Sequence, residues 1–344
     1  MKQTTVWFNS HADVFPEMIR REDKKGELRV IFTDKRWLPN NADFFEVFPN
    51  DLGRDQFTTY SLSFARQHGV NIFIPCSRYK QLSASREAFR AAGVNMVMAG
   101  NEQTIDLVDD KGAAYEHLSD VVPIPQYRVV HDVESFEAAC AELSESCERV
   151  CYKPVDSIFG LGFRVLGKSG ESVPGLFSRQ ERVFDLSQCK EHLSARQYLQ
   201  EGLMVMQYLE GTERSVDCLA QQGKLVSAII RAKEPVSNGA GVKPDNIQLI
   251  EHNPQIVEYV RRITEKLTLH GLFNVQFRNA GDGTPYLLEI NARLSGGAGI
   301  ACMSGVTLPY WAVRLELGTA TSADVPEPKT GFRVQQLEQG IVVL

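Results

Sequence analysis

The chain has 344 residues, 43% hydrophobic and 23% charged, a composition typical of a soluble globular protein with two or three domains. A net charge of −6 argues against a nucleic acid or an anionic membrane as partner. No apolar run approaches the ~18 residues of a membrane-spanning helix, and the N-terminus lacks the apolar core of a signal peptide. Seven cysteines without a CxxC pair predict reduced, buried thiols and a cytoplasmic protein.

Residues 1–100 alternate short apolar segments with helical ones. Predicted strands are TVWFNS, LRVIFTD, DFFEVFP, NIFIPCS and NMVMAG. Helices are predicted over 55–68 and 81–92, each followed by a glycine suited to the C′ position. This alternation predicts a parallel sheet whose ligands bind beyond the strand C-termini. Side chains at that edge are Asn9, Ser10, His11 and those of 34–37; a loop histidine without function is the favoured interpretation of His11.

Residues 101–149 are predicted to be mostly helical, with a break at the prolines of VPIP. Asp132 is predicted to cap a helix whose buried face includes Phe136 and Leu143. The next segment, 150–169, contains a predicted strand VCYKP with Lys153 near its end, a glycine-rich loop and a return strand FRVLGK. Backbone N–H groups of such a loop can cover phosphates, and the lysine supplies a point charge.

Residues 162–169, GFRVLGKS, match the letters of the P-loop motif GxxxxGK[ST]. That motif needs a strand before the first glycine and a helix that opens at the lysine. Here the middle residues FRVL are themselves strand-like, and the following SGESVPGLF is a poor helix start. The match is therefore predicted to be a decoy.

The next predicted elements are a helix over 190–202, a strand in MVMQYLEG and a long loop over 234–246. An amphipathic helix is predicted over 254–270, closed by Gly271. After the glycine-rich LSGGAG, a helix with Pro309 in its first turn ends at Gly318. The remaining tail is predicted to hold a linker and one or two short strands.

Residues 272–297, LFNVQFRNAGDGTPYLLEINARLSGG, predict two strands joined by a tight turn at Asp282-Gly283, of type I′. This turn places Gln276 opposite Glu289. Because side chains alternate along a strand, one face carries a polar set: Asn274, Gln276, Arg278, Glu289, Asn291 and Arg293. The opposite, core face carries Phe273, Val275, Phe277, Leu288 and Ile290.

Two interpretations of the polar face stay open from pattern alone. One is a solvated hairpin face, where alternating polar residues are common. The other is a Mg²⁺ site, because hard cations take oxygen ligands and arginine suits a transferring phosphoryl group. The glycines that follow in LSGGAG favour close approach of a ligand.

The order of these signals resembles the ATP-grasp superfamily. Its features here are Lys111, then KP with a glycine-rich loop, a strand that ends in EGTERSVD, and the hairpin with Gln276 and EINAR. GVTLPYWAVRLELG is also similar to the helix that follows the hairpin in halves of the carbamoyl-phosphate synthetase large subunit and their single-chain relatives. The resemblance implies an α/β fold with a Rossmann-like domain over 1–110. It implies an ATP-grasp N-terminal part with its lid over 111–205, and a C-terminal part over 206–344.

The resemblance also implies residue roles. Lys111 and Lys153 would contact ATP phosphates, and the loop with Gly160 and Gly162 would close over them. Adenine would be held by the backbone of Met206, Gln207, Tyr208 and Leu209. Ribose would be held by Glu213, with Glu210 as the competing residue. Gln276, Glu289 and Asn291 would bind two Mg²⁺ ions, with Mn²⁺ as a substitute. Arg293, with Arg231 as a second cation, would stabilise the transferring phosphoryl group.

The implied activity is ATP-dependent ligation of a small-molecule carboxylate and an amine through an acyl phosphate, with ADP and phosphate released. Two alternatives stay open: a small-molecule kinase with the same ATP site, and a nucleotide-binding regulatory protein without turnover. The family hinge often carries Glu where Met206 stands. The substrates and the oligomeric state, with a homo-oligomer as one alternative, stay open.

Overall fold

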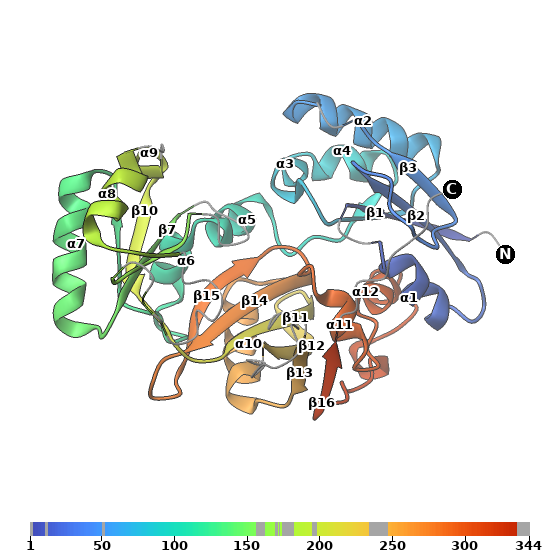
Figure 1. Ribbon diagram of the computed structural model, residues 1–344. Coiled ribbons are helices and arrows are strands. Elements are labelled where there is room, and N and C mark those ends of the chain that lie inside the picture. Colours follow the sequence, from blue (N-terminus) through green and yellow to red (C-terminus); the bar gives the residue numbers. More distant parts are fainter. Residues whose placement is uncertain are drawn as a thin grey trace, which may run out of the picture.

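The computed structural model describes residues 3–10, 13–49, 52–155, 162–168, 171, 173, 182–194, 198–233 and 247–335 (Figure 1). Their strands form three sheets, two of five strands and one of six. The lid residues 156–161, among them Gly160, and the long loop 234–246 lie outside the described residues, as does His11. The α/β class predicted from the sequence is confirmed.

The first sheet is parallel, with the strand order β3-β2-β1-β4-β5. Its strands are β1 (Thr4–Asn9), β2 (Leu28–Asp34), β3 (Phe44–Val47), β4 (Ile72–Pro75) and β5 (Asn95–Met96). This is the order of a doubly wound sheet. The predicted parallel sheet is therefore confirmed. The helices of this part are α1 (Phe15–Glu22), α2 (Arg54–Gln67), α3 (Tyr79–Ser83) and α4 (Arg86–Ala91).

The helix predicted over 81–92 is wrong in detail. It begins two residues earlier and is divided into α3 and α4 by Ala84 and Ser85. The division occurs where SAS supplies small residues that compete for backbone hydrogen bonds. Arg78, before α3, adopts a left-handed conformation (φ 53°). Its guanidinium lies over the ring of Phe57 at 4.4 Å and donates to the Leu52 carbonyl.

The second sheet has the order β6-β10-β7-β8-β9. Its strands are β6 (Tyr127–Val130), β7 (Val150–Pro154), β8 (Arg164–Leu166), β9 (Val183–Phe184) and β10 (Leu203–Gln207). Helices α5 (Glu102–Asp109) and α6 (Lys111–Leu118) precede it, and α7 (Val133–Ser146) covers it. Asp132 caps α7 as predicted, accepting from the Ser135 N–H. The helix predicted over 190–202 is corrected: α8 (Leu186–Ser194) starts earlier, and α9 (Tyr198–Glu201) is separate.

The third sheet has the order β15-β14-β11-β12-β13-β16 and is antiparallel throughout. Its strands are β11 (Glu213–Gln221), β12 (Lys224–Lys233), β13 (Ile247–Glu251), β14 (Gly271–Asn279), β15 (Pro285–Asn291) and β16 (Phe332–Gln335). Its helices are α10 (Pro254–Lys266), α11 (Ala298–Cys302) and α12 (Leu308–Glu316), with a 3₁₀ turn at Ser322–Asp324. Helix α10 ends before the predicted 270, because Thr268 turns left-handed (φ 50°) and Gly271 begins β14.

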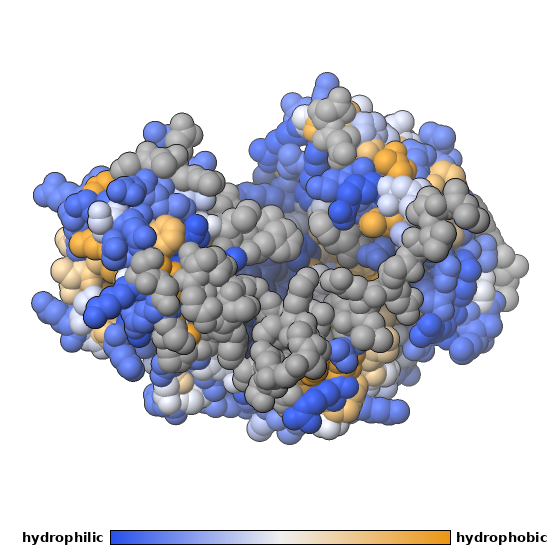
Figure 2. Space-filling view, viewed as in Figure 1, coloured by the Kyte–Doolittle hydropathy of each residue, from blue (hydrophilic) through white to orange (hydrophobic). Residues whose placement is uncertain are grey.

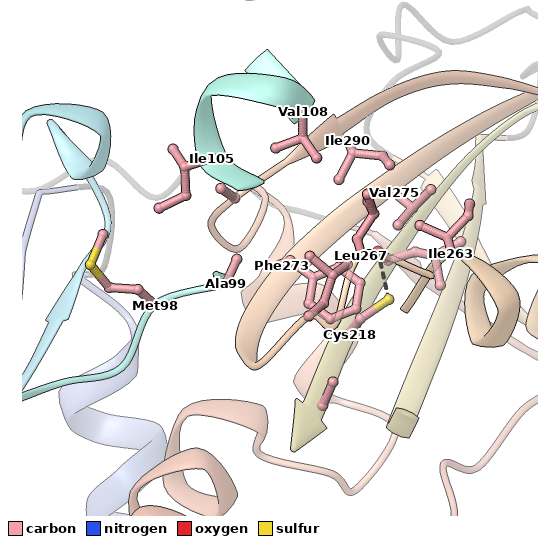
Figure 3. Packing of buried hydrophobic residues seen from close by; sticks show 14 of the residues in the cluster. Met98, Ala99, Ile105, Val108, Cys218, Ile263, Leu267, Phe273, Val275 and Ile290 are labelled. Atoms are coloured by element: carbon pink, nitrogen blue, oxygen red, sulfur yellow. Dashed lines mark hydrogen bonds between the residues drawn. The ribbon is translucent and has the colours of Figure 1, made fainter. Parts of the chain in front are cut away.

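One hydrophobic core joins the first sheet to the third (Figure 3). Met98 and Ala99 follow β5, and Ile105 and Val108 line the buried side of α5. They belong to the same cluster as Phe273 and the other inward side chains of β14. The segment from residue 98 to residue 108 is therefore packed directly against the hairpin.

Figure 2 shows that the surface is hollowed between the part that carries α7 and the part that carries α2. The described residues along this hollow are mostly hydrophilic. Among the helices described, none has the length and apolar character needed to cross a bilayer.

Candidate nucleotide and metal site

Strands β14 and β15 form the predicted hairpin with the predicted register at its functional end. Gln276 lies opposite Glu289, and Asn274 lies opposite Asn291. The turn differs from the predicted type I′, because only Gly283 has a positive φ (85°) and Asp282 does not. The Gly283 N–H donates to the Ala280 carbonyl and the Ala280 N–H to the Thr284 carbonyl. This is a three-residue loop, in which a turn precedes a left-handed glycine.

A β-bulge separates this turn from the polar end of the hairpin. Phe277 pairs with Leu287, so Leu288 is the extra residue of β15. The core assignment of Leu288 is therefore corrected: Leu287 is fully buried in its place. A bulge leaves one backbone group outside the ladder. The Leu288 carbonyl accepts instead from the Tyr115 hydroxyl at 2.7 Å and from the Lys153 ammonium at 3.3 Å.

Gln276, Glu289 and Asn291 lie together on the half-buried polar face of the hairpin. The Gln276 Nε2 donates to Asn274, and the Asn291 Nδ2 donates to Glu289 at 3.1 Å. With each amide nitrogen turned to a neighbour, the amide oxygens are the atoms presented to a cation. Within the described part of the chain, no three His, Cys, Asp or Glu side chains cluster as a metal site. A set of one carboxylate and two amides fits Mg²⁺ that is shared with phosphate oxygens.

Lys153 approaches this face from the second sheet, and Lys111 lies nearby on α6. Lys153 is the residue before the last of β7 and also lies 6.0 Å from the centre of the Tyr115 ring. Lys111 is buried at the start of α6 and donates to the Val155 carbonyl at 2.9 Å. Asp110 caps that helix by accepting from the Gly112 and Ala113 N–H groups. The structure therefore brings both predicted lysines to the root of the lid and one of them to the hairpin.

Burial lowers the pKa of Lys153 from 10.5 to about 8. Desolvation is the largest cause because it disfavours the charged form. Glu289 works in the opposite direction, whereas the neighbouring charge of Lys111 lowers the pKa further. An arriving anion would therefore meet two lysines that repel each other.

Residues 206–209 connect the second and third sheets. Met206 is a buried core residue on β10, paired with Cys151. The N–H groups of Gln207 and Tyr208 donate to the carbonyls of Gln126 and Arg149. Leu209 is buried. The side chain of Tyr208 is stacked by the Arg278 guanidinium at 5.2 Å from its ring centre.

Glu213 begins β11 opposite Arg278, and its carboxylate pairs with Lys233 at 2.5 Å. This arrangement places Glu213 on the same polar face as Gln276. Lys233 was not recognised in the sequence, because a single lysine at a strand end carries no distinctive spacing.

Gly162 is the second glycine of the predicted lid loop and has a positive φ of 76°. A Cβ there would lie 2.8 Å from the Pro154 side chain, so the position requires glycine. Strand β8 occupies residues 164–166 of the P-loop match, and Lys168 beyond it is exposed. The middle of the motif is thus strand, as predicted.

Arg293 follows β15 and faces the end of β4. A small pocket there is lined by Ile74, Pro75, Cys76, Val97, Leu272, Ala292, Arg293 and Leu294. Burial and Asp109 raise the pKa of Tyr79, and Arg293 works against that rise. Asn9, predicted at this rim, is buried and accepts from the Cys76 N–H at 2.8 Å. The first sheet therefore meets the site through the end of β4, and Tyr79 is a neighbour that the pattern analysis missed.

Arg231 lies in β12, directly opposite Ser215, which in turn lies opposite Gln276. Its side chain is 3% exposed and forms an ion pair with Asp217 at 2.8 Å. The pair lies beside the predicted metal ligands but within the protein. Asp217 was not predicted as a functional residue, because a single acidic residue in a strand has no distinctive spacing.

These features define a class of protein: a sheet that carries Lys153 meets an antiparallel sheet that carries a polar hairpin. This is the ATP-grasp fold. Residues 200–340 match the family model described as "ATP-grasp in the biosynthetic pathway with Ter operon".

Known proteins agree with this assignment. The carbamoyl phosphate synthase large chain of Thermoanaerobacter pseudethanolicus is 27% identical over 246 residues, 65% of this chain and 22% of that protein. The chain thus spans less than a quarter of that relative's length. An L-amino acid ligase from Bacillus licheniformis aligns over 95% of this chain and 78% of its own, with a TM-score of 0.63 and 15% identity.

The biotin carboxylase domain of Hydrogenobacter thermophilus 2-oxoglutarate carboxylase, solved with MgADP, ADP and bicarbonate, has a TM-score of 0.67 at 14% identity. The alignment covers 97% of this chain and 74% of the biotin carboxylase chain. The fold and the likeness to carbamoyl phosphate synthase large chains, both predicted from the sequence, are confirmed.

Proposed function

We propose that the protein is an ATP-dependent carboxylate–amine ligase. One observation carries the proposal: Lys153 from the second sheet and Glu289 from the third converge on the Leu288 bulge, and Arg293 lies just after that strand. Such convergence suits a nucleotide triphosphate whose terminal phosphoryl group lies over the hairpin. The similar fold of the Bacillus licheniformis L-amino acid ligase is consistent with this class.

Each residue then has a role in the chemistry. Lys111 and Lys153 bind the phosphates, and Gly160 and Gly162 belong to the lid that excludes water from the activated group. The backbone of 206–209 holds the adenine. Glu213 leaves its ion pair with Lys233 and binds the ribose hydroxyls instead. Gln276, Glu289 and Asn291 hold Mg²⁺, which when bound neutralises phosphate charge.

Arg293 is the catalytic residue of the proposal. A carboxylate is a poor electrophile, and its phosphorylation creates a good leaving group for attack by an amine. The transfer requires in-line positioning and neutralisation of charge on the moving phosphoryl group. The Arg293 side chain is held in place, because its Nη1 donates to the Leu294 carbonyl at 2.8 Å.

We also propose that two Mg²⁺ ions bind, with Mn²⁺ as a substitute, that the protein is cytoplasmic, and that its domain boundaries follow residues 110 and 205. A kinase with the same ATP site is the competing candidate, because both activities share the nucleotide half of the site.

The test is a screen of amino acids and small carboxylates for ADP release, followed by trapping with hydroxylamine. With the right carboxylate, a ligase forms a hydroxamate, ADP and phosphate. Arg293→Ala is expected to lower that trapping by roughly 10²-fold, the scale for loss of one transition-state donor. AMP and pyrophosphate would instead mean adenylation, and a stable phosphorylated product without hydroxamate would favour the kinase.

A further inference from the structure

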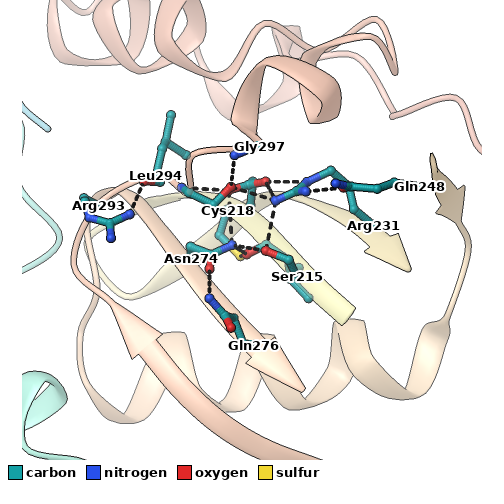
Figure 4. Close-up of polar contacts among 12 residues, drawn as sticks. Ser215, Cys218, Arg231, Gln248, Asn274, Gln276, Arg293, Leu294 and Gly297 are labelled. Atoms are coloured by element: carbon teal, nitrogen blue, oxygen red, sulfur yellow. Dashed lines mark hydrogen bonds and ion pairs between the residues drawn. The ribbon is translucent and has the colours of Figure 1, made fainter. Parts of the chain in front are cut away.

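A buried polar layer lies beside the candidate site, on the strands next to the hairpin (Figure 4). At its centre the Arg231 Nε donates to Asp217 at 2.9 Å, and the Asp217 side chain is fully buried. The other two guanidinium nitrogens donate within the protein as well, Nη1 to Gln248 and Nη2 to Ser215. All three nitrogens of Arg231 are therefore engaged inside the sheet.

This ion pair also holds the loop that follows Arg293. The Arg231 Nη2 donates to the Ser295 hydroxyl at 2.7 Å, and the Ser295 N–H donates to Asp217 at 3.1 Å. The Gly297 N–H then donates to the same hydroxyl at 3.2 Å. A Cβ at Gly297 would overlap the Arg231 guanidinium, so the sequence SGG lets the loop approach the charge. Both members of the pair thus bond to Ser295.

The same pair reaches the metal-ligand candidates through β14. The Asn274 amide nitrogen donates to Asp217 at 3.1 Å and to Ser215 at 2.9 Å. The Asn274 oxygen accepts from the Gln276 amide at 3.4 Å. A continuous set of hydrogen bonds therefore runs from Gln276 through Asn274 and Asp217 to Ser295.

We propose that Asp217, Arg231 and Ser295 are positioning residues, which fix Arg293 relative to Gln276 by bonding the loop 294–297 to β14. The proposal rests on the function proposed above and replaces direct contact of Arg231 with phosphate. A buried ion pair adds little net stability, because desolvation offsets the attraction. Its geometry, however, is well defined, and a displacement of 1 Å at a reacting centre can cost about 10²-fold in rate.

Ser295→Ala tests the idea without uncovering a buried charge. The two charged partners, Arg231 and Asp217, keep their other bonds, so the fold should persist. We expect kcat for hydroxamate formation to fall by about 10-fold or more, with the KM for ATP within about twofold, since no ATP-binding group is lost. Ser295→Thr keeps a hydroxyl and should restore kcat.

The matched control is Ser304→Ala. Ser304 is fully buried in the same part of the chain, and its hydroxyl has no hydrogen-bond partner among the described residues. We expect wild-type kcat for this variant. Wild-type kcat in Ser295→Ala, or equal losses in both alanine variants, would overturn the positioning role.

A second measurement does not need turnover. Hydrogen exchange of the Gly297 amide, which loses its acceptor in Ser295→Ala, should accelerate at least several-fold there and stay unchanged in Ser304→Ala. Unchanged Gly297 exchange in Ser295→Ala overturns the inference. If no carboxylate gives hydroxamate with the wild-type protein, the proposed function fails, whereas the exchange experiment still decides whether Ser295 holds the loop.

Discussion

Binding of a nucleotide should change the protonation of Lys153, and calorimetry can measure this. Because the pKa of free Lys153 is about 8, its ammonium is already mostly formed at pH 7 and mostly absent at pH 9. A phosphate beside it favours the charged form and raises the pKa again. Binding of MgADP should therefore take up ~0.1 proton at pH 7, ~0.5 at pH 8 and ~0.9 at pH 9.

The sign of the affinity change follows from this uptake. Since the complex holds the extra proton, affinity is greatest below pH 8 and falls as the pH rises through 8. Between pH 7 and 9 the loss should be about 10-fold, or ~1.4 kcal/mol. Titrations with MgADP in buffers of different ionisation enthalpy give the proton count directly, and ADP avoids turnover.

Lys153→Met and the exposed Lys168→Ala are the matched variants. The first should bind MgADP weakly and without proton uptake near pH 8, whereas the second should behave like the wild type. Wild-type uptake of zero at pH 8.5, or unchanged uptake in Lys153→Met, would refute the assignment of a phosphate contact to Lys153.

Three further predictions concern the metal set, the thiols and the core. Glu289→Ala should abolish ATP turnover and leave the circular dichroism spectrum and melting temperature near wild type, because the carboxylate is half-buried on a polar face; near-normal turnover would exclude it as a ligand. All seven cysteines are buried, and burial raises the pKa of Cys76 and Cys151 to about 12; mass spectrometry should find these two unmodified after iodoacetamide at pH 8 and modified after unfolding, so rapid native labelling would contradict the packing. Phe273→Ala should lower the free energy of unfolding by about 3–5 kcal/mol, since the ring is fully buried. Denaturant titration measures this, with the exposed Arg90→Ala as a control that is expected within about 0.5 kcal/mol of wild type. The same free energy of unfolding in both variants would mean that this core does not carry stability.

Local pattern was sufficient for most of the elements near the site. The predicted pairing of Gln276 with Glu289 is confirmed, but the pairs nearer the turn are shifted by one residue, and the bulge at Leu288 offsets that shift. The bulge at Leu288 did not follow, because LLE reads as an ordinary strand and the extra residue is specified by partners from α6 and β7. The turn type failed for the same reason: its conformation depends on how the bulge shifts the strand ends.

Long-range pairing explains what sequence reasoning could not supply about the charges. Arg231 and Asp217 are 14 residues apart on neighbouring strands, and Ser295 contacts them from 64 and 78 residues further along the chain. A strand pattern indicates which face an arginine occupies, but not whether its partner comes from solvent, ligand or protein. The same limit applies to Tyr79, which comes to Arg293 from helix α3.

The core shared by the first and third sheets has a consequence for exchanging parts among relatives. Ile105 and Val108 on α5 are packed with Phe273, so a chimera joined after residue 110 would import a foreign helix beneath the hairpin. A junction near 100, before α5, would keep that helix with the strands it supports. Grafting a different N-terminal sheet onto this chain should therefore succeed when the crossover precedes α5 and yield misassembled hairpins when it follows.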